Sequence, residues 1–202
     1  MNNKQAHWEN IYQTKAIHEV SWFQEKPIVS LAYFEKYVQD KNAAIIDIGG
    51  GDSFLVDNLL ALGYNNITVL DISATAIDKA KLRLGDLAQK VKWIVSDITT
   101  FVPTEKYDIW HDRAVFHFLN EEKEKQYYTS ILAQSLNKNG KLIIGTFAID
   151  GPIKCSGIEI TQYSTELLEA KFDFLKLLES EYIDHLTPFN TTQKFVFAVF
   201  ES

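Results

Sequence analysis

The stretch that decides the fold reads IIDIGGGDSF from Ile45 to Phe54. A short apolar run that ends in a glycine-rich turn and opens a helix is typical of the first strand of an α/β sheet that binds a nucleotide-like ligand. Glycine in such a turn lets a ligand come close to the backbone, so Gly49 and Gly51 are predicted to contact one. The alternative is a tight turn that serves the fold alone.

Short apolar runs rich in β-branched residues recur after this stretch, and each is short enough to be a strand. Segments with helical spacing lie between them. The predicted strands are Ala43–Ile48, Ile67–Leu70, Val91–Val95, Tyr107–His111 and Lys141–Phe147, and the predicted helices are Phe54–Leu62, Ser73–Leu84 and Glu122–Leu136. Strands that alternate with helices predict parallel crossovers and helices on both faces of the sheet.

The two ends of the chain depart from this alternation. Phe172–Leu186 and Lys194–Phe200 read as two extended segments with a short connection, which predicts an antiparallel hairpin. Residues 1–42 precede the first strand and contain two predicted helices, Lys4–Thr14 and Pro27–Gln39. We therefore predict an α/β fold with a doubly wound, mostly parallel sheet and an antiparallel C-terminal strand. Residues 1–202 are predicted to form one domain, with an N-terminal helical segment (1–42) and a core (43–202).

Acidic residues stand at the ends of the second and third predicted strands. Asp71 comes twenty residues after Gly51, where a carboxylate can accept hydrogen bonds from both hydroxyls of a ribose. Asp97 follows the third strand, where a carboxylate can accept from an adenine amino group. The alternatives are a helix cap for Asp71, a role that Ser73 can equally fill, and a plain turn residue for Asp97. A dinucleotide fingerprint would need glycine where Phe54 stands, which counts against NAD or FAD.

With these motifs in this order and spacing, the chain resembles the class I S-adenosylmethionine-dependent methyltransferases over nearly its whole length. The resemblance implies a Rossmann-like fold, S-adenosyl-L-methionine as cofactor, and a glycine turn that faces the methionine portion. The family's usual third glycine is Ser53 here, so the turn can sit differently. The core residues that the resemblance assigns to the cofactor are Asp47, Gly49, Gly51, Asp71, Ile72, Asp97, Ile98 and Asp112.

The segment from Tyr107 to Phe118 resembles the family's fourth strand and the loop after it, which borders the methionine end and the acceptor site. Asp112 is predicted near the methionine amino group. The candidate catalytic residues are Arg113, His117 and His111, of which Arg113 and His117 are predicted to face the acceptor. The alternatives are an ion pair for Arg113 and a core position for His117. The family often builds its acceptor pocket from the segment after the fifth strand, here residues 148–165.

Aromatic residues gather in the N-terminal segment, where Trp8 and Tyr12 lie four apart and share a face of a helix. Compact bacterial members of the family carry a similar arrangement, including Trp22 and Phe23, and the segment tends to cover the cofactor. Trp8, Tyr12 and Trp22 are therefore predicted to contact it as a lid. The alternative is that these rings are permanent core.

Composition excludes several function classes. The net charge is −7 with scattered basic residues, so nucleic acid is not expected as a partner. No apolar run is long enough for a signal peptide or a membrane span, and a cytoplasmic location without membrane contact is expected. Cys155 is the only cysteine and the histidines lack metal-ligand spacing, so neither an intramolecular disulfide nor a metal site is expected.

The sequence therefore predicts an S-adenosylmethionine-dependent methyltransferase with a small-molecule acceptor. Two alternatives stay open, which are a protein lysine methyltransferase and a non-catalytic domain that binds S-adenosylmethionine. A general base is needed only if the acceptor carries a proton at neutral pH. Neither the acceptor nor the oligomeric state follows from the sequence.

Overall fold

The computed structural model describes residues 3–202, and the chain divides into two compact units, one ending at Phe101 and the other beginning at Val102. The division falls between the third and fourth long strands, inside the segment 43–202 that was predicted as one core. No helix among residues 3–202 is both long and apolar enough to cross a membrane.

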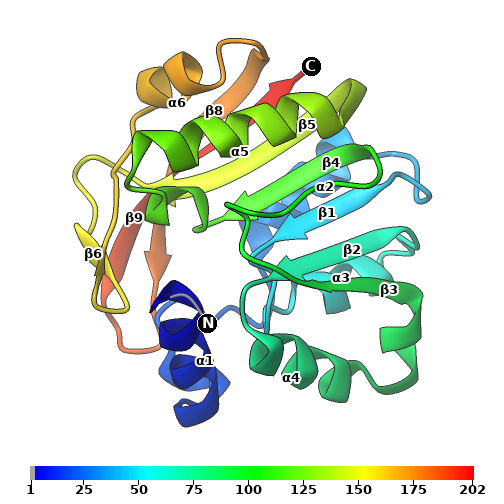
Figure 1. Ribbon diagram of the computed structural model, residues 1–202, viewed down its shortest axis with the longest axis vertical. Helices are drawn as coiled ribbons and strands as arrows, with labels where there is room; N and C mark the ends of the chain where they lie inside the picture. Colours follow the sequence, from blue (N-terminus) through cyan, green and yellow to red (C-terminus); the bar gives the residue numbers. More distant parts are fainter. Residues whose placement is uncertain (1–2) are drawn as a thin grey trace. The chain divides into compact units, whose positions relative to one another are not determined.

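The first unit contains three parallel strands, with β2 between β1 and β3 (Figure 1). Every residue of β1 and β2 is buried, which is why these strands read as continuous apolar runs instead of alternating ones. The elements are α1 (Asn3–Thr14), η1 (Ile17–Glu19), α2 (Ile28–Tyr37), β1 (Ile45–Ile48), α3 (Leu55–Ala61), β2 (Ile67–Asp71), α4 (Ala74–Leu84), η2 (Gly85–Lys90) and β3 (Val91–Val95). All the elements predicted in this half of the chain are present within two or three residues.

The second unit has the strand order β4-β5-β9-β8, in which only the β4–β5 pair is parallel. The predicted C-terminal hairpin is confirmed as β8–β9, and β9 runs antiparallel to β5. The elements are β4 (Tyr107–Arg113), η3 (Phe116–Phe118), α5 (Glu122–Ser135), β5 (Leu136–Phe147), β6 (Lys154–Cys155), β7 (Ile158–Glu159), α6 (Thr165–Lys171), β8 (Lys176–Leu186) and β9 (Thr192–Glu201).

The start of the predicted strand Phe172–Leu186 is wrong. Phe172 ends helix α6, which Ser164 caps by accepting the backbone N–H of Leu167, and β8 begins at Lys176. The Phe172 ring is fully buried, with its centroid 5.1 Å from that of Phe116 and 5.6 Å from that of Phe200. Its apolar character therefore marks a core position between helix and sheet, which periodicity alone does not separate from a strand residue.

The core of the second unit lies between α5, which runs along β4 and β5 in Figure 1, and the strands beneath it. Tyr128 of α5 packs against the rings of Trp110 and Phe116 at 5.9 and 4.9 Å between centroids. All three side chains are fully buried. Burial of this much aromatic area stabilises the fold by about 1.5 to 3 kcal/mol per ring. It also fixes the carboxyl end of β4, where the predicted acceptor residues begin.

Candidate functional site

The glycine turn after β1 folds back over two carboxylates of its own unit. Gly49 and Gly51 have φ values of 67° and 35°, which disfavour any residue with a side chain. A Cβ atom on Gly51 would lie 2.5 Å from Oδ2 of Asp71, and one on Gly50 would collide with the carboxylate of Asp47. The glycines are thus required for the turn to close over Asp47 and Asp71. A Gly51→Val variant would consequently lose this packing whether or not a ligand binds there.

Asp71 ends β2 with its carboxylate under the glycine turn. The residue is 4% exposed, and Oδ1 accepts the backbone N–H of Ser73 at 2.8 Å. Ser73 itself is the cap of α4, because its hydroxyl accepts the N–H of Ala76 at 3.1 Å. Burial, together with the charges of Asp47 and Glu9, raises the pKa of Asp71 to about 7. A buried carboxyl group whose pKa is raised this far is more typical of a binding site than of a helix cap.

The three acids around this turn decide which ligand charge the site favours. Asp47 and Asp71 are 3% and 4% exposed, and both Asp47 and Glu9 act on the charge of Asp71. Such a cluster repels the two phosphates of NAD and attracts a sulfonium or ammonium group. The three carboxylates therefore fit S-adenosylmethionine. Asp71 would accept hydrogen bonds from its ribose, and the negative charges would attract its positive groups.

Helix α1 is attached to this edge of the unit by Glu9, a residue that the sequence analysis missed. Oε1 of Glu9 accepts the backbone N–H of Ala74 at 2.6 Å and that of Thr75 at 3.4 Å, so it satisfies the free N-terminus of α4. Partial burial opposes ionisation of Glu9, but these bonds outweigh it and its pKa lies below the ordinary value. One turn earlier, the amide of Gln5 donates to the carbonyl of Ile72 at 3.4 Å. Gln5 and Glu9 share a helix face, and that spacing was the available signal.

Arg83 holds the loop that follows the glycines and was also missed. Its guanidinium pairs with the carboxylates of Asp52 and Asp57 and donates to the carbonyl of Ser53 at 2.8 Å. It also lies 4.1 Å from the centre of the Phe54 ring. Between 26 and 31 residues separate these partners, so no local pattern announces the contact. Position 53, where the family pattern has glycine, is thereby fixed through its backbone.

The remaining cofactor residues predicted in the first unit have mixed surroundings. Oδ1 of Asp97 accepts the N–H and the hydroxyl of Thr99 at 2.9 and 2.7 Å, so Asp97 at least makes the turn that was its alternative role. Ile98 is buried, and Ile72 is half-buried beside Asp71. Contact of these residues with adenine stays a prediction.

The N-terminal aromatics form one half-buried cluster. Ring centroids of Trp8 and Tyr12 are 6.3 Å apart, and Trp22 lies 5.8 Å from Trp8 and 6.3 Å from Tyr12. None of the three is among the fully buried residues, so they are not core in the sense of β1. The three rings thus pack as one cluster, and both their role as a lid and their contact with a cofactor stay predictions.

In the second unit, Asp112 ends β4 with its carboxylate turned onto its own loop. It accepts the N–H groups of Val115 and Phe116 at 2.8 and 3.1 Å and the hydroxyl of Tyr128 at 2.7 Å. These bonds hold Ala114, whose φ of 73° is unusual for a residue with a side chain. Burial raises the pKa of Asp112 to about 6. The surroundings favour a role in shaping the loop, and the predicted contact with the methionine amino group stays untested.

His117 follows that loop and is completely buried. Its Nδ1 accepts the backbone N–H of Phe147 at 3.3 Å, and its Nε2 has no protein partner within residues 3–202. Burial and the neighbouring charge of Arg113 lower the pKa of His117 to about 3. The imidazole is therefore neutral at physiological pH, and because Nδ1 is an acceptor the proton sits on Nε2. His117 can donate a hydrogen bond but cannot act as a general base at Nε2.

The other two catalytic candidates lie on one face of β4. Arg113 is half-buried, with its guanidinium 5.5 Å from the centre of the Phe195 ring. His111 is 2% exposed and pairs in the sheet with Ile143. Cys155, in the segment predicted to build an acceptor pocket, is buried, and burial raises the pKa of its thiol to about 11. Arg113 thus lies within electrostatic reach of both His117 and Cys155.

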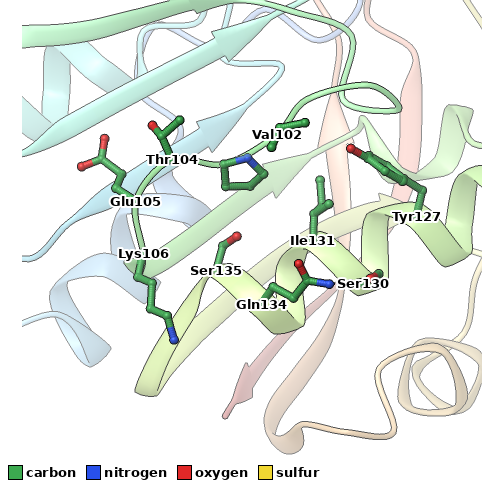
Figure 2. Close-up of a pocket in the computed structure, with 10 residues that line it drawn as sticks. Val102, Thr104, Glu105, Lys106, Tyr127, Ser130, Ile131, Gln134 and Ser135 are labelled. Carbon is green, nitrogen blue, oxygen red and sulfur yellow. Dashed lines mark hydrogen bonds between the residues drawn. The ribbon is translucent and has the colours of Figure 1, made fainter.

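A cavity of about 390 Å³ opens elsewhere in the second unit, between residues 102–106 and helix α5 (Figure 2). Its walls include Val102, Lys106, Tyr127 and Gln134. It lies beside the start of β4, whereas Asp112 and Arg113 stand at the other end of that strand. None of the predicted site residues lines it. Among residues 3–202 no group of histidine, cysteine and acidic side chains could hold a metal ion.

Comparison with known proteins shows what this chain is similar to. Residues 46–142 match the family model described as a methyltransferase domain. The malonyl-[acyl-carrier protein] O-methyltransferase of Anoxybacillus flavithermus is 34% identical over 105 residues, which are 51% of this chain and 38% of that enzyme. The EEF1A lysine methyltransferase 2 of Danio rerio is 26% identical over 154 residues, 68% of this chain and 66% of that protein. The chain therefore spans well under half of the first relative's length.

Among solved structures, an S-adenosylmethionine-dependent methyltransferase from Anabaena variabilis has the same fold, with a TM-score of 0.75 and 16% identity. The match covers 100% of this chain and 96% of that one. The predicted fold class and the resemblance to the class I methyltransferases are thereby confirmed.

Proposed function

From the methyltransferase domain that spans residues 46–142, we propose that this protein is an S-adenosylmethionine-dependent methyltransferase with a small-molecule acceptor. The observation that carries the proposal is Asp71. It combines the position of a ribose-binding acid at the end of β2 with burial and with a raised pKa of about 7. A purely structural turn has no need of a carboxyl group in that state.

When bound, S-adenosylmethionine would supply an electrophilic methyl group to a lone pair of the acceptor, with its sulfur as the leaving group. The chain's own residues do the binding and the exclusion of water. Asp71 accepts the ribose hydroxyls, Asp47 attracts the cationic groups, and the aromatic cluster of Trp8, Tyr12 and Trp22 adds faces that attract cations. Alignment in a water-poor site accounts for most of the rate in such a displacement.

A small acceptor is the first choice because the segment after β5 is short and closed on itself. Segment 149–162 leaves β5 and returns at Tyr163, whose N–H donates to the carbonyl of Phe147 at 2.9 Å. Within it, Gln162 donates to the carbonyl of Gly151 at 2.7 Å, so the loop is closed on itself. The enzyme from A. flavithermus is named for a malonyl group, a small acceptor group that a carrier protein holds.

A protein lysine is the second candidate. Two observations favour it, namely the similarity to the lysine methyltransferase of D. rerio and the net charge of −7, which would attract a basic target. Turnover assays that compare lysine-rich peptides with small carboxylic acids and amines as acceptors separate the two classes.

The cytoplasmic location stays a prediction.

Calorimetry with S-adenosylmethionine, S-adenosylhomocysteine and NAD tests the proposal. We expect the first two to bind and NAD not to bind. Replacement of Asp71 by alanine removes two hydrogen bonds to a charged group, each worth about 1.5 to 3 kcal/mol, so affinity should fall tenfold or more.

The matched control is Asp86→Ala, which removes an exposed acid of the same unit in η2, beyond the C-terminal end of α4 and away from the glycine turn. Binding by a folded Asp71→Ala protein at wild-type affinity would refute the ribose assignment. Binding of NAD in preference to S-adenosylhomocysteine would refute the proposed function.

A further inference from the structure

His117 presents a hydrogen-bond donor that the described part of the chain does not use. Its Nδ1 accepts the N–H of Phe147, which places the proton on Nε2, and Nε2 is buried without a protein partner in residues 3–202. A buried donor left unpaired costs about 1 to 3 kcal/mol, and native proteins rarely keep one without a purpose. The missing partner must be a hydrogen-bond acceptor.

Sheet register shows what surrounds this donor. Arg113 pairs with Gly145, and Phe147 pairs with Phe195 on the next strand. Gly145 and Phe147 are two residues apart on β5, so Arg113, Phe147 and Phe195 lie on one face of the sheet. The ring of His117 lies 4.7 Å from that of Phe147, and the guanidinium of Arg113 lies 5.5 Å from the ring of Phe195. The imidazole of His117 and the guanidinium of Arg113 thus lie next to the aromatic rings of Phe147 and Phe195.

We propose that the Nε2–H of His117 binds an oxygen of the methyl acceptor, and that the acceptor is a carboxylate. This inference rests on the proposed methyltransferase function. It adds a substrate class, an anionic oxygen acid, and a residue that selects it. Because Nε2 is enclosed in the structure, binding of the acceptor requires the groups around it to move.

The chemistry around His117 favours a carboxylate over an amine. An ammonium acceptor must lose a proton before it can attack. Neutral His117 already carries a proton on Nε2, and the guanidinium of Arg113 is fully protonated, so neither group can take up that proton there. Burial keeps the thiol of Cys155 protonated as well, since it raises its pKa to about 11. The charge of Arg113 also repels an ammonium group. A carboxylate has no proton to lose, attracts Arg113 and accepts from His117.

The test uses three probes of the same shape and different charge, which are benzoate, benzamide and benzylamine, added to the protein saturated with S-adenosylhomocysteine. Titration calorimetry should show benzoate binding at least tenfold more tightly than benzylamine. His117→Phe, which keeps an aromatic ring but has no donor, should weaken benzoate binding about tenfold or more. His117→Gln, whose amide can donate from nearly the same place, should restore part of it.

Nitrogen NMR of the histidine-labelled wild-type protein gives a readout that needs no variant. The His117 ring should carry its proton on Nε2 between about pH 5 and 8, and that signal should shift when benzoate is added. Equal or tighter binding of benzylamine, a proton on Nδ1, or unchanged benzoate binding in His117→Phe would each overturn the inference. Binding of S-adenosylhomocysteine is measured first and independently, so its absence would count against the proposed function and not against the role of His117.

Discussion

Two buried carboxyl groups at strand ends show how the same residue type serves different purposes. The carboxylate of Asp112 accepts hydrogen bonds from Val115, Phe116 and Tyr128, and these bonds shape the loop that carries Ala114. Asp71 receives its hydrogen bonds from the adjoining backbone and is repelled by Asp47 and Glu9, which leaves its ionised form poorly stabilised. A carboxylate has about four acceptor positions, and we propose that ribose hydroxyls occupy the remaining ones of Asp71.

This difference predicts a proton released on binding. With its pKa raised to about 7, Asp71 is mostly protonated at pH 6 in the folded protein and ionised in the unfolded one, so between about pH 4 and 7 its contribution to stability falls as the pH rises. Ribose hydroxyls favour the carboxylate and lower that pKa. Binding of S-adenosylhomocysteine at pH 6 should therefore release up to about one proton, and affinity should rise toward pH 7 and then level off.

Calorimetry in buffers of different ionisation enthalpy counts this proton. The Asp71→Asn protein, which cannot ionise at that position, should release none and should gain stability at pH 8 in the absence of ligand. A wild-type protein that releases no proton at pH 6 would show that Asp71 does not face the ligand.

At the scale of elements, the contact between α1 and α4 connects the N-terminal segment with the predicted ribose site. Glu9 compensates the positive N-terminus of α4, and the ammonium group of Lys79 donates to the carbonyl of Lys15 at 3.0 Å. Both bonds lie within a few residues of Asp71 or of the aromatic cluster. Whatever binds beneath the glycine turn therefore lies next to the attachment point of α1.

Replacing Glu9 by glutamine should loosen α1 without disturbing the strands. The amide can still accept a hydrogen bond but loses the charge that favours the helix N-terminus, a change of about 0.3 to 1 kcal/mol or more. Hydrogen exchange across residues 5–25 should become two- to fivefold faster, while exchange in β1 and β2 stays unchanged. Bound S-adenosylhomocysteine should slow exchange in the same segment of the wild-type protein.

Glu35→Gln is the matched control, because Glu35 is an exposed acid on α2. It should leave exchange across residues 5–25 as it was. If the wild-type segment is equally protected with and without S-adenosylhomocysteine, the aromatic rings are permanent core and the lid hypothesis is wrong.

At the scale of the whole molecule, charge favours a cationic ligand. The chain carries a net charge of −7, and Asp47, Asp71 and Glu9 concentrate acid at one turn of the first unit. Aromatic faces in α1 and the following segment add a further preference for cations. S-adenosylmethionine has one positive charge more than S-adenosylhomocysteine, so the two ligands report on this field.

The two affinities should respond differently to salt. Raising the ionic strength from about 0.02 to 0.5 M shortens the screening length from about 20 to about 4 Å, so binding of S-adenosylmethionine should weaken several-fold. Binding of S-adenosylhomocysteine should change less, because it lacks the sulfonium charge. Equal salt dependence of the two dissociation constants, measured by calorimetry, would show that the acid cluster does not act on the sulfonium.

The sequence by itself determined the order of strands and helices, the glycine turn and the acid at the end of β2. These features depend on local chemistry, since continuous apolar runs, glycines and strand-end acids carry their meaning within about ten residues. The start of β8 was misjudged at Phe172 for the same reason, because an apolar residue reads alike in a strand and in a helix–sheet core.

Only the tertiary structure decided which side chains are free to act. Arg83 reaches the loop at Asp52 and Ser53 across about thirty residues, Glu9 reaches α4 across 65, and Phe147 reaches Nδ1 of His117 across 30. Contacts of that length leave no periodic trace in the chain. They nevertheless determine that Asp112 shapes its loop and that His117 is a neutral donor, because protonation and hydrogen-bond capacity follow from burial and from partners that only folding supplies.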